Sequence, residues 1–278
     1  MFTYLMLSIV SLTTAIDVTC PIFSDGRISP KVTPAQFDET TSPFSSSNVK
    51  GDGLKFSQIL TFPDIPASRF DIPSGKPVQI NINDKSIFKP GGGTPQTGFR
   101  RAGLLLANND GKDASNTGVK TFHWSVRTVA SKPLNYSHEY INVWHETDDY
   151  SASQWNFQTG DKIGKPATGS KDWWIVNRRN ERIFTAPASS AEWQNFAITT
   201  DFVKNTIQVF SSIGNEPLVN KTGALPNDNS GAGQFQIGIL KKGKGGGGPN
   251  QGTQPSNINE GLIYGGIFIE DSAQGCIS

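Results

Sequence analysis

The sequence predicts an all-β protein, a β-jelly roll or related antiparallel sandwich of two sheets. Short segments with alternating or continuous apolar residues recur along the 278-residue chain, and glycine, proline, asparagine and aspartate separate them. The 29 glycines and 17 prolines are spread between these segments. After the first 15 residues, no stretch keeps a helical period for the roughly 12 residues that distinguish a helix. Together these observations favour a sandwich over a parallel α/β fold.

The expected strands follow from the same pattern. In chain order they are residues 54–62, 77–83, 98–107, 120–129, 138–146, 173–178, 182–187, 196–202, 206–212, 235–241 and 261–271. Short polar links predict two hairpins, which join 173–178 to 182–187 and 196–202 to 206–212. The glycine-rich stretch 241–257 contains nothing to bury, so we expect a flexible surface loop there.

The N-terminus has the features of a secretory signal. Residues 1–15, MFTYLMLSIVSLTTA, form an apolar run that ends in small residues suited to signal peptidase, although no basic residue precedes it. A membrane anchor is the alternative, and it needs about 20 apolar residues. We therefore expect a secreted, extracellular protein with one domain over residues 16–278.

Charge and composition narrow the range of partners. A formal net charge of +1 gives no field suited to nucleic acid or an anionic membrane, and no later segment reaches the length of a membrane span. Two cysteines and three histidines show no zinc-binding spacing, so a metal site is not expected. The chain has no heptads, which predicts a monomer.

The two cysteines lie near the ends of the mature chain. Cys20 and Cys276 have a single possible connectivity in an oxidising compartment, and we expect a disulfide that ties the termini together. The alternative is a pair of unpaired buried thiols. Asn135 and Asn220 each begin an N-glycosylation triplet, which predicts surface positions for both.

The segment HEYINVWHE, residues 138–146, concentrates residues that could carry chemistry. In a regular strand one face would carry Glu139, Ile141, Val143 and His145, and the other His138, Tyr140, Asn142, Trp144 and Glu146. The second set is typical of a row that faces a ligand, so alternation favours Glu146. Unless a bulge intervenes, the two glutamates cannot form one acid–base pair.

Glycosidic hydrolysis needs two carboxyl groups, about 5–5.5 Å apart for retention or roughly 6.5–9.5 Å apart for inversion. The other candidate acids are Glu260, Asp271, Asp148 and Asp149. A Ser-His-Asp triad fits less well, because the chain has no GxSxG elbow. A polysaccharide lyase with a histidine or tyrosine base beside Arg101 stays open as an alternative, and it would need uronic acid substrates.

Aromatic residues make up 10% of the chain, and several lie beside amides and arginines in the expected strands. Sugars stack their C–H faces on aromatic rings while their hydroxyl groups pair with such polar side chains. Filling the core is the alternative role for any one tryptophan. We expect a concave sugar-binding face built from the strands near 98–107, 120–129 and 138–146. Its expected substrate-binding residues are Arg101, Gly103, His123, Tyr140, Asn142, Trp144 and His145.

Long strings of residues resemble glycoside hydrolase family 131, and they match in order over nearly the whole mature chain. They are residues 20–27, 49–64, 67–71, 84–88, 98–104, 118–126, 133–146, 193–202, 227–242 and 259–272, which include GFRRAGL, SHEY and NEGLIYGG. The resemblance implies a secreted fungal β-glucanase with a jelly-roll catalytic domain. It also implies hydrolysis of β-1,3-, β-1,6- or β-1,4-linked glucan without a metal or organic cofactor.

The resemblance bears on the catalytic carboxylates. It identifies the glutamate of SHEY, Glu139, as the stronger catalytic candidate, whereas alternation favours Glu146, and we keep both as the expected catalytic residues. Many members resembling this chain have a glutamate directly after the FRRA string, where this chain has Gly103. The expected function is therefore β-glucan hydrolysis. The alternative is a lectin-like glucan-binding protein with reduced or lost catalysis.

Overall fold

The computed structural model describes residues 20–71 and 75–278, so the expected signal segment lies outside the described residues. The strands are β1 (Ile22–Asp25), β2 (Leu60–Thr61), β3 (Val78–Asn83), β4 (Arg100–Leu105), β5 (Val119–Thr128), β6 (Glu139–Glu146), β7 (Ser153–Gly160), β8 (Asp172–Asn177), β9 (Arg182–Pro187), β10 (Gln194–Asp201), β11 (Thr206–Ile213), β12 (Val219–Asn220), β13 (Leu225–Pro226), β14 (Gln234–Lys241) and β15 (Asn259–Asp271). The described helices are three short 3-10 turns, η1 (Pro34–Asp38), η2 (Phe56–Gln58) and η3 (Ala114–Asn116). Across these described ranges, no helix is long and apolar enough to cross a membrane.

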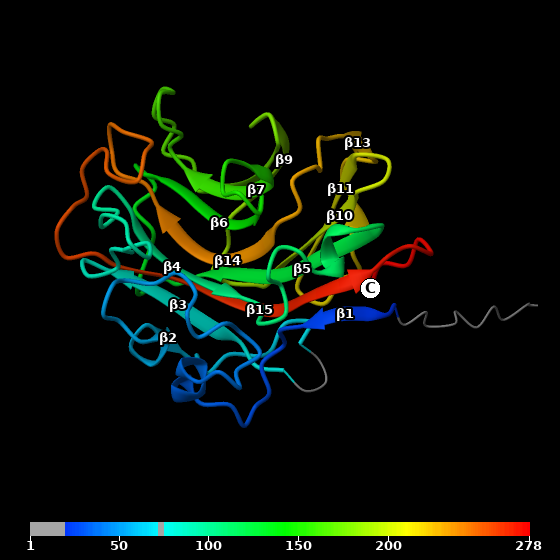
Figure 1. Cartoon of the computed structure of the whole chain (residues 1–278), viewed down its shortest axis with the longest axis horizontal. Helices are drawn as coiled ribbons and strands as arrows, with labels where there is room; N and C mark the ends of the chain where they lie inside the picture. Colours follow the sequence, from blue (N-terminus) through cyan, green and yellow to red (C-terminus); the bar gives the residue numbers. More distant parts are fainter. Residues whose placement is uncertain (1–19, 72–74) are drawn as a thin grey trace, which may run out of the picture.

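The strands form two antiparallel sheets. One has six strands in the order β4-β14-β6-β7-β8-β9. The other has nine, in the order β12-β11-β10-β5-β15-β3-β2, with β1 beside β15 and β13 beside β11. In Figure 1, β6 and β7 lie above β15 and β3. The consecutive strands β4, β5 and β6 alternate between the sheets, as in a jelly roll. The predicted all-β sandwich and both predicted hairpins, β8 with β9 and β10 with β11, are confirmed.

Aromatic side chains from both sheets meet in the core. Trp124 of β5 stacks on Trp155 of β7 and on Phe196 of β10, with ring centroids 5.9 and 5.6 Å apart. Phe122 of β5 packs against Phe235 of β14 at 5.2 Å. Each of these rings is fully buried, so aromatic packing dominates the space between the two sheets.

The segment 54–62 forms less strand than the sequence predicts. Its first half is the 3-10 turn η2, because the carboxylate of Asp38 accepts hydrogen bonds from the backbone N–H of Phe56 at 2.7 Å and from the hydroxyl of Ser57 at 2.5 Å. The turn leaves only the two residues of β2 to pair with β3.

Two strands of the six-stranded sheet differ from the expected arrangement. Strand β7 was not predicted, although Trp155 and Phe157 alternate there with glutamine and asparagine. Strand β14 takes the place between β4 and β6, while β5 lies between β10 and β15 in the other sheet. The expectation that residues 120–129 help to line the concave face is therefore wrong.

A buried ion pair links the two sheets. Lys241 of β14 donates a 2.5 Å hydrogen bond to Glu260 of β15, and the Tyr140 hydroxyl of β6 donates to the same carboxylate at 2.7 Å. Burial lowers the pKa of Lys241 and raises the pKa of Tyr140 well above its usual value. Glu260, one of the candidate acids, is therefore buried between the sheets, where it binds Lys241 and Tyr140.

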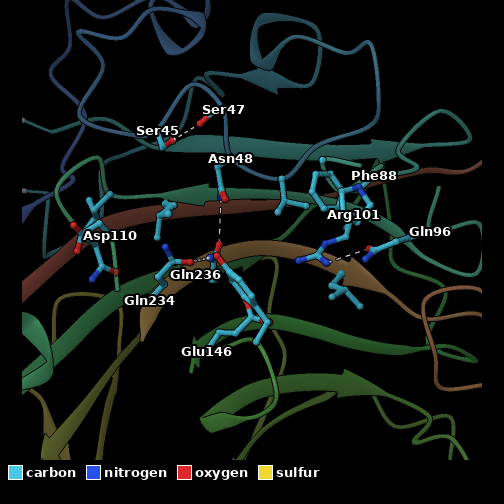
Figure 2. Close-up of a pocket in the computed structure, with 18 of the residues that line it drawn as sticks. Ser45, Ser47, Asn48, Phe88, Gln96, Arg101, Asp110, Glu146, Gln234 and Gln236 are labelled. Atoms are coloured by element: carbon cyan, nitrogen blue, oxygen red, sulfur yellow. Dashed lines mark hydrogen bonds between the residues drawn. The ribbon is translucent and has the colours of Figure 1, made fainter. Parts of the chain in front are cut away.

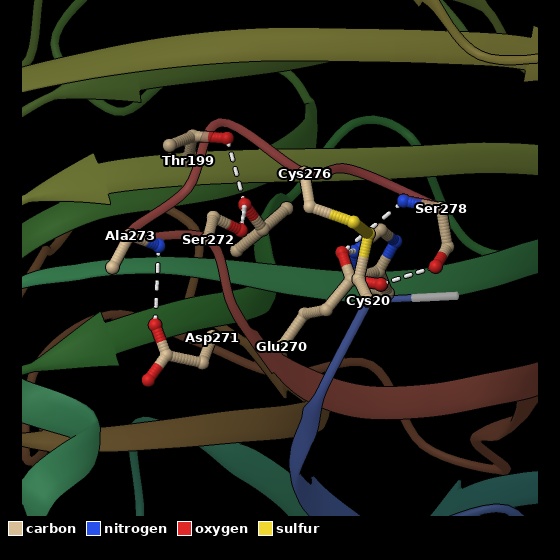
Figure 3. The surroundings of a disulfide bond; sticks show 10 residues. Cys20, Thr199, Glu270, Asp271, Ser272, Ala273, Cys276 and Ser278 are labelled. Atoms are coloured by element: carbon tan, nitrogen blue, oxygen red, sulfur yellow. Dashed lines mark hydrogen bonds and ion pairs between the residues drawn. A yellow bond between two sulfur atoms is a disulfide. The ribbon is translucent and has the colours of Figure 1, made fainter. Parts of the chain in front are cut away.

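The expected disulfide joins Cys20, which precedes β1, to Cys276, which follows β15 (Figure 3). The link is short in space because β1 pairs with β15, and it closes a loop with a sequence separation of 256 residues. Beside it the Glu270 carboxylate lies 2.9 Å from His123 Nε2 and accepts a 3.2 Å hydrogen bond from the backbone N–H of Ser278. The disulfide therefore holds Cys20 and the C-terminal residues against the nine-stranded sheet.

Replacing both cysteines by serine is expected to lower the free energy of unfolding by about 2–5 kcal/mol, because the unfolded chain regains the freedom that the cross-link removes. Urea unfolding of the wild type and the double variant, both without a reducing agent, measures this difference. The wild type should also be two hydrogen masses lighter before reduction than after it. Two thiols that react with an alkylating agent in the native protein, or an unchanged unfolding free energy, would contradict the prediction.

Candidate active site

Strand β6 changes phase at Asn142. Across its pairing with β7, Ile141 lies opposite Gln158 and Val143 lies opposite Phe157, so Asn142 is an extra residue in a β-bulge. On either side of the bulge, the side chains in the core are Tyr140, Val143 and His145, and those on the outward face include Ile141 and Trp144. Alternation from Trp144 places Glu146 on the outward face as well.

A groove of about 810 Å³ lies over β4, β14 and β6 on this outward face. In Figure 2, Arg101, Phe88 and Gln96 lie on one side of the groove, and Asp110 and Gln234 lie on the other. Its aromatic, amide and charged lining has the composition that suits a polyhydroxylated ligand.

Strand β6 contributes one carboxyl group to the groove, that of Glu146. Burial raises its pKa, while the positive charge of Arg101 and a hydrogen bond from Trp144 counter part of that effect. The net shift keeps a larger fraction of this side chain protonated near neutral pH than an ordinary glutamate would have. A protonated carboxylic acid in a ligand groove can donate a proton.

Arg101 of β4 presents a guanidinium group with unused donors. Its centre lies 5.5 Å from the ring of Phe88 and 5.9 Å from the ring of Trp144. Its Nη1 donates a long hydrogen bond to the side-chain oxygen of Gln96, at 3.3 Å. Its buried Nε has no hydrogen-bond partner among the described residues. Burial lowers the pKa of Arg101 to about 10, so it stays charged at neutral pH. The group can donate to a ligand in the groove.

The segment before η2 covers the free edge of β4 and brings an amide into the groove. Gly103 of β4 donates its backbone N–H to Val49 at 2.9 Å. Asn48 donates from Nδ2 to the Gly103 carbonyl at 3.0 Å and to Gln236 at 3.2 Å, and Gln236 donates to Gln234 at 3.1 Å. Figure 2 shows Asn48 directed toward Gln236 across the groove. The amides thus form a connected row of donors and acceptors.

Position 103 faces the groove without a side chain. Its neighbours Ala102 and Leu104 belong to the core, whereas Arg101 and Leu105 line the groove. A Cβ atom added to Gly103 would meet the Ile237 carbonyl at 3.5 Å and Asn48 at 3.7 Å, which are ordinary contacts. A larger residue could therefore start here and extend toward the ligand.

A sequence profile described as the glycoside hydrolase 131 catalytic N-terminal domain matches residues 22–275. The chain belongs to glycoside hydrolase family 131. The resemblance seen in the sequence is confirmed at the level of the family.

Two solved structures share the fold of this family 131 chain. The GH131 β-glucanase catalytic domain from Podospora anserina is 18% identical with a TM-score of 0.73, and the alignment covers 90% of this chain and 96% of that one. The catalytic domain of the family 131 protein from Coprinopsis cinerea is 16% identical with a TM-score of 0.69, covering 90% and 94%. A comparison with curated protein sequences finds no match.

Three of the expected substrate-binding residues of the family 131 chain do not reach the groove. His123 is fully buried on β5 and stacks on Phe268 in the nine-stranded sheet, at 4.3 Å. Tyr140 points into the core toward Glu260. His145 also points inward, where its Nδ1 lies 2.8 Å from Gln154, and burial lowers its pKa to about 4, which keeps it neutral. Strand phase explains Tyr140 and His145, which point inward from β6, whereas His123 misses the groove because β5 belongs to the nine-stranded sheet.

Two other expectations concern amide side chains. Asn142 is fully buried at the bulge, and its side-chain nitrogen and oxygen have no partner among the described residues. It does not belong to the groove lining. Asn135 and Asn220 are both exposed, as the glycosylation pattern requires.

Glu139 lies apart from Glu146. The bulge places both glutamates on the outward face, but seven positions of extended strand separate them by roughly 20 Å, too far for one catalytic pair. Glu139 lines a second cleft of about 440 Å³. There Lys242 donates a 2.5 Å hydrogen bond to its carboxylate, which also accepts the backbone N–H of Ile163 at 2.8 Å.

The amide side chains that line the groove were not predicted from the sequence. Gln234 and Gln236 alternate with the core residues Phe235 and Ile237, and this alternation was the available signal. No local pattern points to Asn48, which reaches the groove from a loop. In the described part of the chain, no group of three or more His, Cys, Asp or Glu side chains is arranged to hold a metal ion.

Replacing Glu139 by glutamine is expected to lower the free energy of unfolding by about 1–3 kcal/mol, because a charged hydrogen bond to Lys242 is lost in a largely buried position. Urea unfolding measures the loss, and the Lys242→Gln single and double variants complete a thermodynamic cycle. A coupling energy near zero would show that the pair does not hold this cleft together.

Proposed function

We propose that this family 131 chain is a secreted hydrolase of β-linked glucans, with the polysaccharide bound in the groove over β4, β14 and β6. The observation that carries the proposal is the placement of Glu146, a carboxyl group with a raised pKa that lines this groove beside Arg101. Family membership supports a glycoside hydrolase. The printed name of the Podospora anserina relative, a β-glucanase, supports β-glucan as the substrate.

Glu146 is proposed as the general acid. It protonates the glycosidic oxygen as the bond to the anomeric carbon breaks, and the leaving sugar departs as an alcohol. The carboxylate that remains is stabilised by the charge of Arg101 and the indole N–H of Trp144. The amides of Asn48, Gln234 and Gln236 are proposed to bind sugar hydroxyl groups.

Water is proposed to enter beside Gly103 and to form the new bond to the anomeric carbon. The proton that this water loses passes to solvent, and the Glu146 carboxylate is reprotonated from solvent for the next turnover. Position 103 has no carboxylate to activate that water, so turnover is proposed to be slow. No metal or organic cofactor takes part in this scheme, and the protein is proposed to act as an extracellular monomer of fungal origin. The Cys20–Cys276 disulfide and the exposed sequons at Asn135 and Asn220 are consistent with secretion.

A glucan-binding protein with reduced or lost catalysis is the second candidate. The glycine at position 103 favours this candidate. Of the residues that the strands contribute to the groove, Glu146 is the carboxylic acid. Such a groove can bind a glucan without a second strand carboxylate, which hydrolysis normally uses. The two candidates differ in one measurable property, the release of reducing ends from a bound glucan.

Replacing Glu146 by glutamine is expected to lower the rate of glucan hydrolysis by about 100-fold or more, because the proton donor is lost. Reducing ends released from laminarin, a mixed-linkage β-glucan and cellulose oligomers measure the rate. Glu139→Gln is the matched control, and it should keep most of the activity. The wild-type rate should fall as the pH rises through the raised pKa of Glu146, since only the protonated form donates.

Loss of activity in Glu139→Gln but not in Glu146→Gln would reverse the assignment. Binding of glucan by the wild type without any release of reducing ends would support the second candidate instead.

Replacing Gly103 by glutamate is expected to raise the hydrolysis rate by about tenfold or more, because a carboxylate on the groove face can activate water or attack the sugar. The added Cβ fits at ordinary contact distances. Gly103→Gln has a similar volume without the charge and is the control. Equal rates for the two variants would show that position 103 does not supply the second carboxylate.

A further inference from the structure

Tyr150 is a large aromatic residue exposed at the groove. Its exposed fraction is 68%, and it lines the groove together with Glu146, Asp110 and Gln234. It lies in the turn between β6 and β7, four residues after Glu146. An exposed aromatic ring beside amide and carboxyl groups is a common composition for a sugar-binding site.

The backbone of Tyr150 is strained. Its φ angle is +58°, in the left-handed region that bulky side chains rarely adopt. The other non-glycine residues with positive φ in the described ranges are Asn180, Asn205, Asn257 and Ala232. Asparagine is tolerated there, whereas tyrosine is an outlier. Such outliers cluster at functional sites.

Hydrogen bonds that do not involve the tyrosine ring fix this turn. The backbone N–H of Tyr150 donates to Thr147 at 2.9 Å, and Thr147 donates its own N–H to Ala152 at 2.9 Å. The Asp149 carboxylate accepts from the Thr147 hydroxyl at 2.7 Å and from the Ser151 N–H at 3.0 Å, and these bonds lower the pKa of Asp149 to about 2. Glycine or asparagine at position 150 would suit this turn better.

The ring itself packs against nothing that would explain its presence. Within residues 20–71 and 75–278, the Tyr150 hydroxyl takes part in no hydrogen bond, and the ring makes no stacking or cation contact. In the same hairpin, by contrast, the ring of Trp155 stacks on Trp124 at 5.9 Å. Among the described residues, no hydrogen bond, ring contact or cation contact of this side chain offsets its backbone strain.

We propose that Tyr150 is a sugar-stacking residue, which binds the C–H face of a glucose unit at the Asp110–Gln234 end of the groove. The proposal rests on the proposed function, because it names a subsite of the same groove. The hydrogen-bonded turn fixes the backbone of Tyr150 before the ligand arrives, so no loop has to be ordered on binding. The strained backbone is then the consequence of placing an aromatic ring where the turn prefers asparagine or glycine.

Two substitutions separate the ring from the backbone. Tyr150→Asn removes the ring and suits the positive φ angle, whereas Tyr150→Phe keeps the ring and the strain. Val203→Ala is the control, because Val203 is also exposed, at 76%, and lies outside the groove. All three are made in the Glu146→Gln background, which prevents turnover during the measurement. Dissociation constants for laminarin and a soluble mixed-linkage β-glucan are then measured by calorimetry, together with melting temperatures.

Tyr150→Asn is expected to weaken glucan binding by about tenfold and to raise the melting temperature by about 2 °C. Tyr150→Phe and Val203→Ala should bind as the parent does. A structural tyrosine would behave differently, since its loss would lower the melting temperature and leave binding unchanged.

The results distinguish failure of this inference from failure of the proposed function. Parent-like binding by Tyr150→Asn would overturn the stacking role and leave the glucan-binding groove intact. Absence of glucan binding by both the wild type and the Glu146→Gln parent would overturn the proposed function and the subsite with it.

Discussion

The groove depends on a single extra residue in β6. Asn142 lets the two halves of the strand satisfy different constraints, because the bulge shifts the phase of alternation between them. Before the bulge, Tyr140 reaches the buried pair of Lys241 and Glu260. After the bulge, Trp144 lies on the outward face, packed against Phe99 and Leu240. In a regular strand Tyr140 and Trp144 would share one face, and either the buried pair would lose a partner or the outward face would lose its indole.

The same bulge sets the electrostatics of the outward face. It places Glu139 and Glu146 on one side of the sheet but at opposite ends of the strand, where they meet different cations. Lys242 donates a hydrogen bond directly to Glu139. Arg101 acts on Glu146 through its charge alone, and burial outweighs that effect, so the pKa of Glu146 is raised.

The local sequence predicted where the strands lie in the chain better than it predicted which strands pair in the sheets. Apart from β7, alternation identified the long strands and both hairpins, because each depends on residues close in the chain. The insertion of β14 between β4 and β6 depends on long-range pairing, and no local pattern encodes it. The bulge is equally hidden, since HEYINVWHE reads as one regular strand. That single missed residue put Tyr140 in the expected ligand row. Asn48 was missed for a related reason, because a loop supplies it.

The absence of a side chain at position 103 also bears on the electrostatics of Glu146. A second carboxylate at position 103 would add a like charge to the groove, and like charges raise the pKa of a neighbouring carboxyl group. Without it, burial alone opposes the ionisation of Glu146, while Arg101 and Trp144 favour it. The raised pKa in this chain therefore reflects the protein environment of Glu146 rather than a partner acid.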